Sequence, residues 1–223
     1  IGAMLGHDTG VLCAPTAFGK TVSAAALIAR RGINTLILVH RTELLRQWQE
    51  RLQAFLQVGS GAIGTIGGGK SKPSGIIDIA VVQSLSRKGV ISDHIKNYGQ
   101  VIVDECHHLS AVSFEALLRS ATGRYVLGLT ATPVRRDGQQ PIIFMQCGPI
   151  RHSAARPASA PHDLSVVPRL LSKHIDLPAG VGIQEVFRRL ADDAERTAKI
   201  VSEVVAAYNT ARKILVLTER TEH

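Results

Sequence analysis

Short runs of valine, isoleucine and leucine recur along this chain, and each is followed by a stretch with a helical pattern. The runs lie at residues 10–14, 35–39, 78–82, 101–104 and 125–129. Because their apolar residues are continuous instead of alternating with polar ones, we expect strands that are buried on both faces. Strands that alternate with helices in this way predict an α/β fold with a parallel sheet flanked by helices.

The stretches between the runs give the expected helices. One should extend from Lys20 to Arg31 and end at Gly32, and another from Thr42 to Gln57 with Thr42 as its N-cap. A short helix is expected near Ser84, and a further one over about 110–120. Ligands of parallel sheets bind beyond the carboxyl ends of the strands, so the site residues should follow the runs directly.

The composition changes after the last of these runs. Residues 151–182 are rich in proline, alanine and serine, which is typical of a connecting segment. A helical pattern follows and leads to the apolar run "KILVLT", which resembles a strand. We therefore predict a first domain over 1–150, a connector over 151–195 and the start of a second domain over 196–223. Since a strand needs neighbours, the final run indicates a fragment of a longer protein.

The charge and the cysteines narrow the classes of partner. Lys and Arg total 26 against 18 Asp and Glu, and the net charge of +8 favours an anionic partner, either nucleic acid or nucleotide. Cys13, Cys106 and Cys147 are far apart, which predicts neither a disulfide framework nor a zinc site and indicates an intracellular, cytoplasmic protein. No apolar run approaches the ~18–20 residues of a membrane span, so no membrane partner is expected.

The stretch "LCAPTAFGKT" ends like the Walker A phosphate-binding loop, and it lies between an expected strand and an expected helix. Gly19 would let the backbone turn tightly beside a phosphate, Lys20 would reach the β- and γ-phosphates, and the Thr21 hydroxyl would bind Mg²⁺. Ala14 replaces the first glycine of the pattern at a strand end, where a methyl group is tolerable. Ala17 replaces a glycine found in many related loops, and its Cβ would be strained at a positive φ. Alone, G-K-T also occurs by chance.

A second motif, "VIVDECHH", follows the fourth run. Asp104 ends the strand, where its carboxylate can hold Mg²⁺ opposite the phosphate loop. Glu105 can orient or deprotonate an attacking water. An acidic pair in this place is also compatible with a helix N-cap and a solvated neighbour. Two strand-end motifs in this order together favour nucleotide binding. Zinc binding by His107 and His108 is disfavoured, because adjacent residues do not converge on one ion.

These two motifs resemble motifs I and II of the superfamily 2 helicases, the DEAD/DEAH-like group, with a DECH box as motif II. Four further segments fit in the family's order: "VHRTELLRQW" resembles motif Ia, "VVQSLS" motif Ib, "LTATP" motif III and "ILVLTERTEH" the motif IV region. The sequences of motifs Ia and IV are most similar to those of the branch that contains type III restriction translocases and xeroderma pigmentosum B-type repair helicases.

The resemblance implies a RecA-like P-loop NTPase lobe, followed by a partial second lobe that the full-length chain would complete. It implies the ATP-binding lobe of a nucleic-acid-dependent ATPase, a helicase or translocase that acts on DNA rather than RNA, with ATP and Mg²⁺ as cofactors. Motifs V and VI, with their arginine fingers, have no counterpart in this sequence. Because such fingers contribute about 10³–10⁵ in rate, this chain should bind ATP but hydrolyse it poorly.

The resemblance also assigns roles to single residues. The nucleotide-binding residues would be Ala17, Phe18, Gly19, Lys20 and Thr21. The catalytic residues would be Glu105 as the base, Asp104 and Lys20, with Thr21 and Asp104 as the magnesium ligands. The residues that couple the nucleotide state to lobe motion would be His107, Thr130 and Thr132. The residues along the nucleic-acid track would be Arg41, Thr42, Gln83 and Ser84.

Some alternatives remain open at this point. The chain could be a nucleotide-gated nucleic-acid-binding module with little or no hydrolysis, if Ala17 weakens the phosphate loop. A P-loop protein unrelated to nucleic acid, such as a metabolic kinase, would not explain "LTATP" or "VHRTELLRQW". Arg41 and Gln83 could be ordinary polar loop residues. Trp48 fits a core position better than a base-stacking platform. Arg135 and Arg136 fit a solvated turn as well as a contact with nucleic acid.

Overall fold

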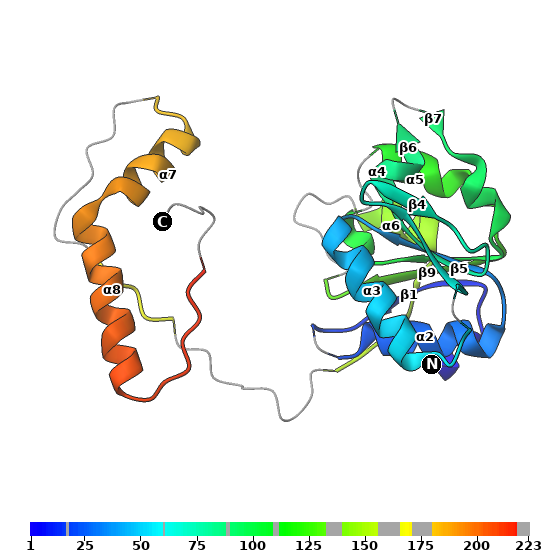
Figure 1. Ribbon diagram of the computed structural model, residues 1–223, viewed down its shortest axis with the longest axis horizontal. Coiled ribbons are helices and arrows are strands. Elements are labelled where there is room, and N and C mark those ends of the chain that lie inside the picture. Colours follow the sequence, from blue (N-terminus) through cyan, green and yellow to red (C-terminus); the bar gives the residue numbers. More distant parts are fainter. Residues whose placement is uncertain are drawn as a thin grey trace. The chain divides into compact units, whose positions relative to one another are not determined.

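The computed structural model describes residues 1–16, 18–59, 61–87, 90–108, 112–132, 140–155, 166–170 and 180–217. The chain forms two compact units, Ile1–Ala160 and Pro161–His223. Figure 1 shows the first as a sheet with helices around it and the second as a pair of helices.

The first unit contains an eight-stranded sheet in the order β10-β1-β9-β8-β2-β5-β3-β4. Its strands are β1 (Thr9–Cys13), β2 (Thr35–Val39), β3 (Ile63–Gly67), β4 (Lys70–Lys72), β5 (Ile77–Val81), β8 (Gln100–Val103), β9 (Tyr125–Thr130) and β10 (Ile150–Ser153). All neighbours pair in parallel except β3 and β4, which form an antiparallel hairpin. A separate two-stranded sheet pairs β6 (Ser86–Arg87) with β7 (Val90–Ile91).

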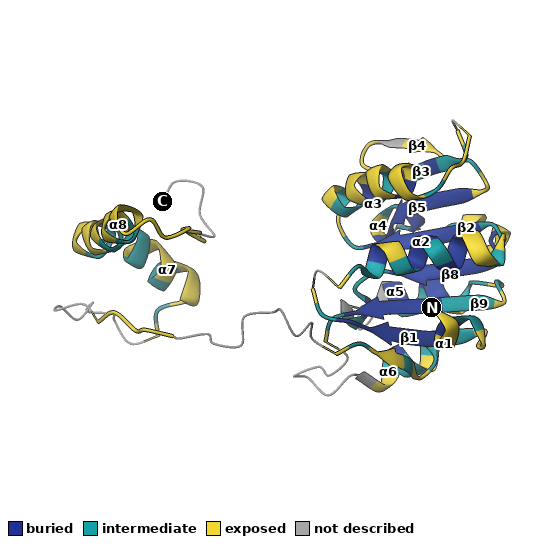
Figure 2. Cartoon of the chain, turned by 90° about the horizontal axis from the view of Figure 1, so that it is seen from below, coloured by how far each residue is buried: buried dark blue, intermediate teal, exposed yellow. Residues whose placement is uncertain are grey.

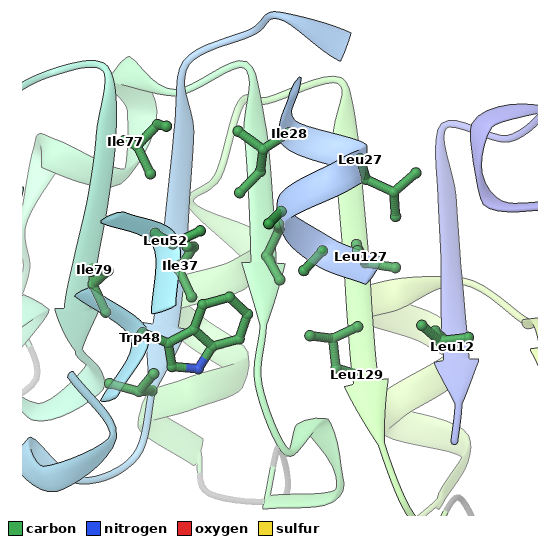
Figure 3. Packing of buried hydrophobic residues seen from close by; sticks show 14 of the residues in the cluster. Leu12, Leu27, Ile28, Ile37, Trp48, Leu52, Ile77, Ile79, Leu127 and Leu129 are labelled. Atoms are coloured by element: carbon green, nitrogen blue, oxygen red, sulfur yellow. The ribbon is translucent and has the colours of Figure 1, made fainter. Parts of the chain in front are cut away.

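Helices cover both faces of this sheet, which is buried between them (Figure 2). They are α1 (Gly2–Leu5), α2 (Lys20–Arg31), α3 (Thr42–Phe55), α4 (Val82–Leu85), α5 (Val112–Arg119) and α6 (Gln140–Cys147), with 3₁₀ turns η1 (Asp93–Asn97) and η2 (Cys106–His108). Alternate residues of the strands face opposite sides. Ile37 therefore packs with Leu27 and Trp48 from α2 and α3 (Figure 3), whereas Leu36 packs in the cluster that holds Leu117 of α5.

The continuous apolar runs predicted the central strands well. The bounds of β2 and α2 agree with the expected ones, and Gly32 ends α2 in the left-handed conformation. The prediction of Thr42 as an N-cap is wrong: Arg41 is the N-cap and Thr42 the first helical residue, with no side-chain capping bond. Helix α3 ends at Phe55, two residues before the expected end, since Leu56 is already extended.

Three strands of the sheet, β3, β4 and β10, were not predicted. The glycine-rich segment 64–70, expected as a flexible turn, contributes to the β3–β4 hairpin, whose turn holds Gly67, Gly68 and Gly69 at positive φ. Strand β10 begins at Ile150, the last residue of the predicted first domain, and runs into the segment expected to be a connection; it pairs with β1 as the edge strand of the sheet. Its sequence "IRHS" is mostly polar and exposed, so it carries no apolar strand signal.

The described part of the second unit contains α7 (Ile183–Asp192) and α8 (Ala194–Asn209). Asp193 caps α8, and its carboxylate accepts a hydrogen bond from the Arg196 N–H at 3.0 Å. The expected strand at "KILVLT" is not formed over Lys213–Leu217, which are exposed and lack regular structure. Within 166–170 and 180–217 the unit offers no strand with which it could pair. The division into three domains stays a prediction.

Candidate nucleotide-binding site

Three neighbouring strands bring the predicted motifs together. In the sheet β9 lies between β1 and β8, and all three are parallel. The phosphate loop follows β1, Asp104 and Glu105 follow β8, and Thr130 ends β9. Because carboxyl ends of parallel strands share one edge of a sheet, these groups face a common site.

The phosphate loop leads directly into α2. Gly19 has φ +96°, a left-handed conformation that favours glycine, and Lys20 begins the helix. Ala14 is fully buried, and its N–H donates to the Thr130 carbonyl at 2.9 Å. Its methyl group is therefore accommodated in the core. The side chain of Phe18 is 40% exposed. Ala17 lies outside the described residues, as do Arg135 and Arg136.

A continuous set of contacts joins the three loops. Lys20 Nζ lies 3.2 Å from Glu105 Oε1, and Glu105 Oε2 lies 3.3 Å from His107 Nδ1. His107 Nδ1 is also 3.0 Å from Thr130 Oγ1, which accepts a hydrogen bond from the Thr132 N–H at 3.1 Å. Five predicted site residues therefore form one network, which runs through side chains from Lys20 to Thr130 and ends at the backbone N–H of Thr132.

The backbone at Glu105 is strained. Its φ is +48°, a left-handed conformation that costs a non-glycine residue roughly 1–3 kcal/mol. This geometry aims the carboxylate at both Lys20 and His107. The carboxylate is thus held between the Lys20 ammonium group and the His107 imidazole.

The four residues predicted to contact nucleic acid lie in two segments that follow neighbouring strands. Arg41 and Thr42 follow β2, Gln83 and Ser84 lie in α4 after β5, and β2 pairs with β5. Gln83 Nε2 donates to the His40 carbonyl at 3.4 Å, which links the two segments. The four side chains therefore lie at the same edge of the sheet as the phosphate loop, but they follow strands that are three and four positions away from β1 in the strand order.

Comparisons with known proteins identify the family of this chain. The family described as "Type III restriction enzyme, res subunit" matches residues 4–135, which is more than half of the chain. The chain belongs to this family. It is 32% identical over 150 residues to the DNA 3'-5' translocase XPB2 of Sulfurisphaera tokodaii, which covers 67% of this chain and 33% of that protein. It is 31% identical over 213 residues to the DNA 3'-5' helicase XPB of Kineococcus radiotolerans, covering 90% of this chain and 38% of that protein.

Solved structures confirm the fold. The UvsW helicase of bacteriophage T4 superposes with a TM-score of 0.57 and 21% identity, covering 67% of this chain and 57% of that one. The chain thus carries the RecA-like N-terminal lobe of a superfamily 2 helicase, as the type III restriction family implies. It spans about a third of the length of the two curated relatives. No helix among the described residues is long and apolar enough to cross a membrane.

In this family member, two residues of α3 reach the expected magnesium ligands. Trp48 Nε1 donates to Asp104 Oδ2 at 2.7 Å, and Arg51 Nη1 donates to Thr21 Oγ1 at 3.1 Å. The Trp48 side chain is only 2% exposed, so its core position is confirmed and stacking on a base is excluded. Sequence reasoning missed both contacts. The available signal was the spacing of three residues, which places both on one helix face.

The environment of Asp104 acts on its charge in two directions. Burial raises the pKa of its carboxyl above the ordinary value, and the hydrogen bond from Trp48 lowers it. The Glu105 N–H also donates to Asp104 Oδ1 at 3.0 Å. Both carboxylate oxygens thus have a donor on the protein side and keep further lone pairs, as a metal ligand needs. Thr21 and Asp104 together fit the oxygen ligands that Mg²⁺ prefers.

Replacing Arg51 with methionine should strengthen the binding of Mg²⁺ in the presence of ATP. The guanidinium occupies a lone pair of the Thr21 hydroxyl and opposes a second cation there. Arg51 is exposed, so we expect a gain of about two- to fivefold, equivalent to roughly 0.5–1 kcal/mol. Calorimetric titration of Mg²⁺ at saturating ATP measures it. Arg46→Met, an exposed arginine of the same helix, is the control, and weaker Mg²⁺ binding in Arg51→Met would show that the arginine supports the site.

Proposed function

We propose that this chain is the ATP-binding lobe of a nucleic-acid-dependent ATPase, which couples ATP hydrolysis to movement along DNA or to its remodelling. The observation that carries the proposal is the network from Lys20 through Glu105 and His107 to Thr130, because it joins the phosphate loop to a loop with no place in phosphate binding. The two curated relatives are named as a DNA 3'-5' translocase and a DNA 3'-5' helicase, which supports DNA as the partner.

The side chains suggest the order of events. ATP phosphates would bind at the start of α2, where the backbone N–H groups and Gly19 form an anion site. Lys20 would turn from Glu105 to the phosphates, since both compete for its ammonium group. Glu105 would then be free to accept the proton of the attacking water. Mg²⁺ held by Thr21 and Asp104 would supply charge neutralisation at the phosphates.

His107 would transmit the movement of the Glu105 carboxylate to the loop that follows β9. It contacts both Glu105 and Thr130, so a shift of the Glu105 carboxylate alters the partner set of the imidazole. Thr130 in turn holds the backbone of Thr132. We infer that this path couples the nucleotide state to lobe movement, with the residues that the helicase resemblance assigned to it.

Arg41, Thr42, Gln83 and Ser84 would contact the phosphates of the nucleic acid. A guanidinium, an amide and two hydroxyls suit binding that does not depend on sequence. These four residues follow β2 and β5, so the carboxyl end of the adjacent strand β8 is left to the nucleotide. The two ligands would therefore bind along one edge of the sheet without competing.

Replacing Arg41 with alanine should weaken nucleic-acid binding several-fold, by a similar factor for different sequences. Loss of one phosphate contact should also reduce the slope of log K against log salt by about one. Fluorescence anisotropy with labelled single- and double-stranded DNA and with RNA, with and without Mg·ATP, measures both. Arg30→Ala removes the same charge from the last turn of α2, at the opposite edge of the sheet, and should leave binding unchanged.

Assays of ATP turnover and DNA binding on the full-length protein, which would supply the second lobe, distinguish the competing functions. DNA that stimulates ATP turnover, with Glu105→Gln abolishing it, supports the ATPase. DNA binding that changes with ATP but without any turnover would favour the nucleotide-gated binding module. Equal affinity for DNA and RNA would remove the DNA preference, and absence of Mg·ATP binding would contradict the proposal as a whole.

A further inference from the structure

The indole of Trp48 lies against a carboxylate and not only within the core. Its Nε1–H donates to Asp104 Oδ2 at 2.7 Å, across 56 residues of sequence. An indole has a single donor and no acceptor, so this bond uses its whole hydrogen-bonding capacity. The bond is charge-assisted when Asp104 is ionised, which makes it one of the stronger kinds.

The packing around Trp48 fixes the direction of that donor. The ring belongs to a buried cluster with Leu45 and Leu52 of α3 and with Ile37 and Ile79 of the sheet, and Figure 3 shows it lying between the helix and the strands. A side chain that is 2% exposed in such a cluster has little freedom to change rotamer. The N–H therefore points to a fixed place at the carboxyl end of β8.

The carboxylate is correspondingly fixed from both sides. Trp48 holds Oδ2 and the Glu105 N–H holds Oδ1, so rotation of the carboxylate would break one of the two bonds. The lone pairs that remain face away from these donors. A buried ring thus sets which lone pairs Asp104 offers, in the way that partners of metal ligands orient them.

We propose that Trp48 is a positioning residue of the magnesium site, which orients the Asp104 carboxylate for Mg²⁺ through its indole N–H. This inference rests on the proposed function, in which Asp104 is a magnesium ligand. It assigns to Trp48 a role besides packing, and that role depends on one hydrogen atom of the ring.

Trp48→Phe separates the two roles, since it keeps an aromatic ring and removes the N–H. Loss of such a partner typically lowers metal affinity about 10- to 100-fold. We therefore expect the apparent affinity for Mg²⁺, titrated by calorimetry at saturating ATP, to fall at least about tenfold. The affinity for ATP in EDTA should stay within about twofold, because the N–H does not contact the phosphate loop.

Leu52→Val is the matched control. Leu52 lies on the same helix and in the same cluster, is fully buried, and has no polar atom to offer Asp104. The substitution Leu52→Val loosens the packing without removing the hydrogen bond from Trp48 to Asp104. The Mg²⁺ affinity of this variant should therefore equal that of the natural chain. Thermal unfolding by circular dichroism compares the folding of both variants.

The natural chain provides a second readout, because Trp48 is its only tryptophan. Binding of Mg²⁺ at Asp104 changes the charge beside the indole and should shift its emission when Mg²⁺ is added to the ATP complex. Asp104→Asn should abolish the shift. This readout needs no substitution at Trp48 and decides the question if Trp48→Phe does not fold.

The outcomes are distinct. Equal Mg²⁺ affinity in Trp48→Phe and the natural chain, or an emission that ignores Mg²⁺ although calorimetry shows its binding, would overturn the inference alone. An equal loss in Leu52→Val would also overturn it, because packing would then explain the effect. A natural chain without Mg²⁺-dependent ATP binding would overturn the proposed function as well.

Discussion

Replacing Lys20 with alanine should lower the affinity of the chain for Mg·ATP by about a hundredfold. A hydrogen bond to a charged group contributes about 1.5–3 kcal/mol, and each 1.4 kcal/mol is a tenfold change in affinity. The substitution also leaves Glu105 without the cation that lies 3.2 Å from it in the natural chain. Its negative charge would then act on the phosphates without compensation, which adds to the loss.

Calorimetry with Mg·ATP measures this effect, and Lys96→Ala is the matched control. Lys96 is a half-exposed lysine in η1 that pairs with Asp93, at the amino end of β8 and so at the opposite edge of the sheet. Lys96→Ala removes the same charge as Lys20→Ala and should leave ATP binding unchanged. Equal loss in both variants would indicate an effect of net charge, and full affinity in Lys20→Ala would remove the phosphate loop from the site.

Residual binding in Lys20→Ala would have a structural meaning. The backbone donors before α2 do not depend on the lysine, and they would retain a weak anion site. Comparison with Gly19→Ala would separate the two contributions, because Gly19 has φ +96° and a Cβ there is strained. The lysine variant should keep the native loop, and the glycine variant should distort it.

The sequence predicted the central part of the fold because its signals are local. A strand such as β2, buried on both faces, must be a continuous apolar run, and α2 is bounded by Gly19 and Gly32 in left-handed conformations. Strand β10 gives no such signal, since its polar residues lie at a sheet edge and its pairing with β1 spans some 140 residues. Pairing over such a distance depends on the assembled fold.

The candidate site shows the same division. The motifs identified Lys20, Asp104 and Glu105 as neighbours, because strand ends of a parallel sheet meet at one edge. They did not reveal that Trp48 and Arg51 reach the same ligands. Those contacts depend on how α3 lies across the sheet, and a buried tryptophan at helical spacing has the same pattern whether or not its N–H has a partner.

Replacing Asp78 with alanine should cost about 3–5 kcal/mol of folding stability. The carboxylate is fully buried and accepts hydrogen bonds from the Ser74 N–H, the Gly75 N–H and the Tyr98 hydroxyl at 2.7, 2.7 and 2.6 Å. Its removal leaves three donors without this acceptor, and Tyr98 is itself only 3% exposed. Buried donors that lose an ionic partner account for the largest losses of this kind.

Tyr98→Phe separates the single bond from the whole network. It removes one hydrogen bond and should cost about 1–2 kcal/mol. The double variant should lose less stability than the two single variants lose together, because Asp78→Ala has already deprived the Tyr98 hydroxyl of its acceptor. Urea denaturation followed by Trp48 emission measures these values for the first unit, where the only tryptophan lies. Strict additivity would contradict the network.

The same pair predicts how stability changes at alkaline pH. Burial, together with the Asp78 carboxylate, raises the pKa of Tyr98 above its ordinary value. Below about pH 10 the Tyr98 phenol keeps its proton in both the folded and the unfolded chain, and the stability that the protonated Tyr98 contributes is fully present. As the pH rises further, the unfolded chain releases the proton first, so stability declines. Tyr98→Phe should decline less over this range, and an identical decline would show that Tyr98 and Asp78 do not interact as the structure has them.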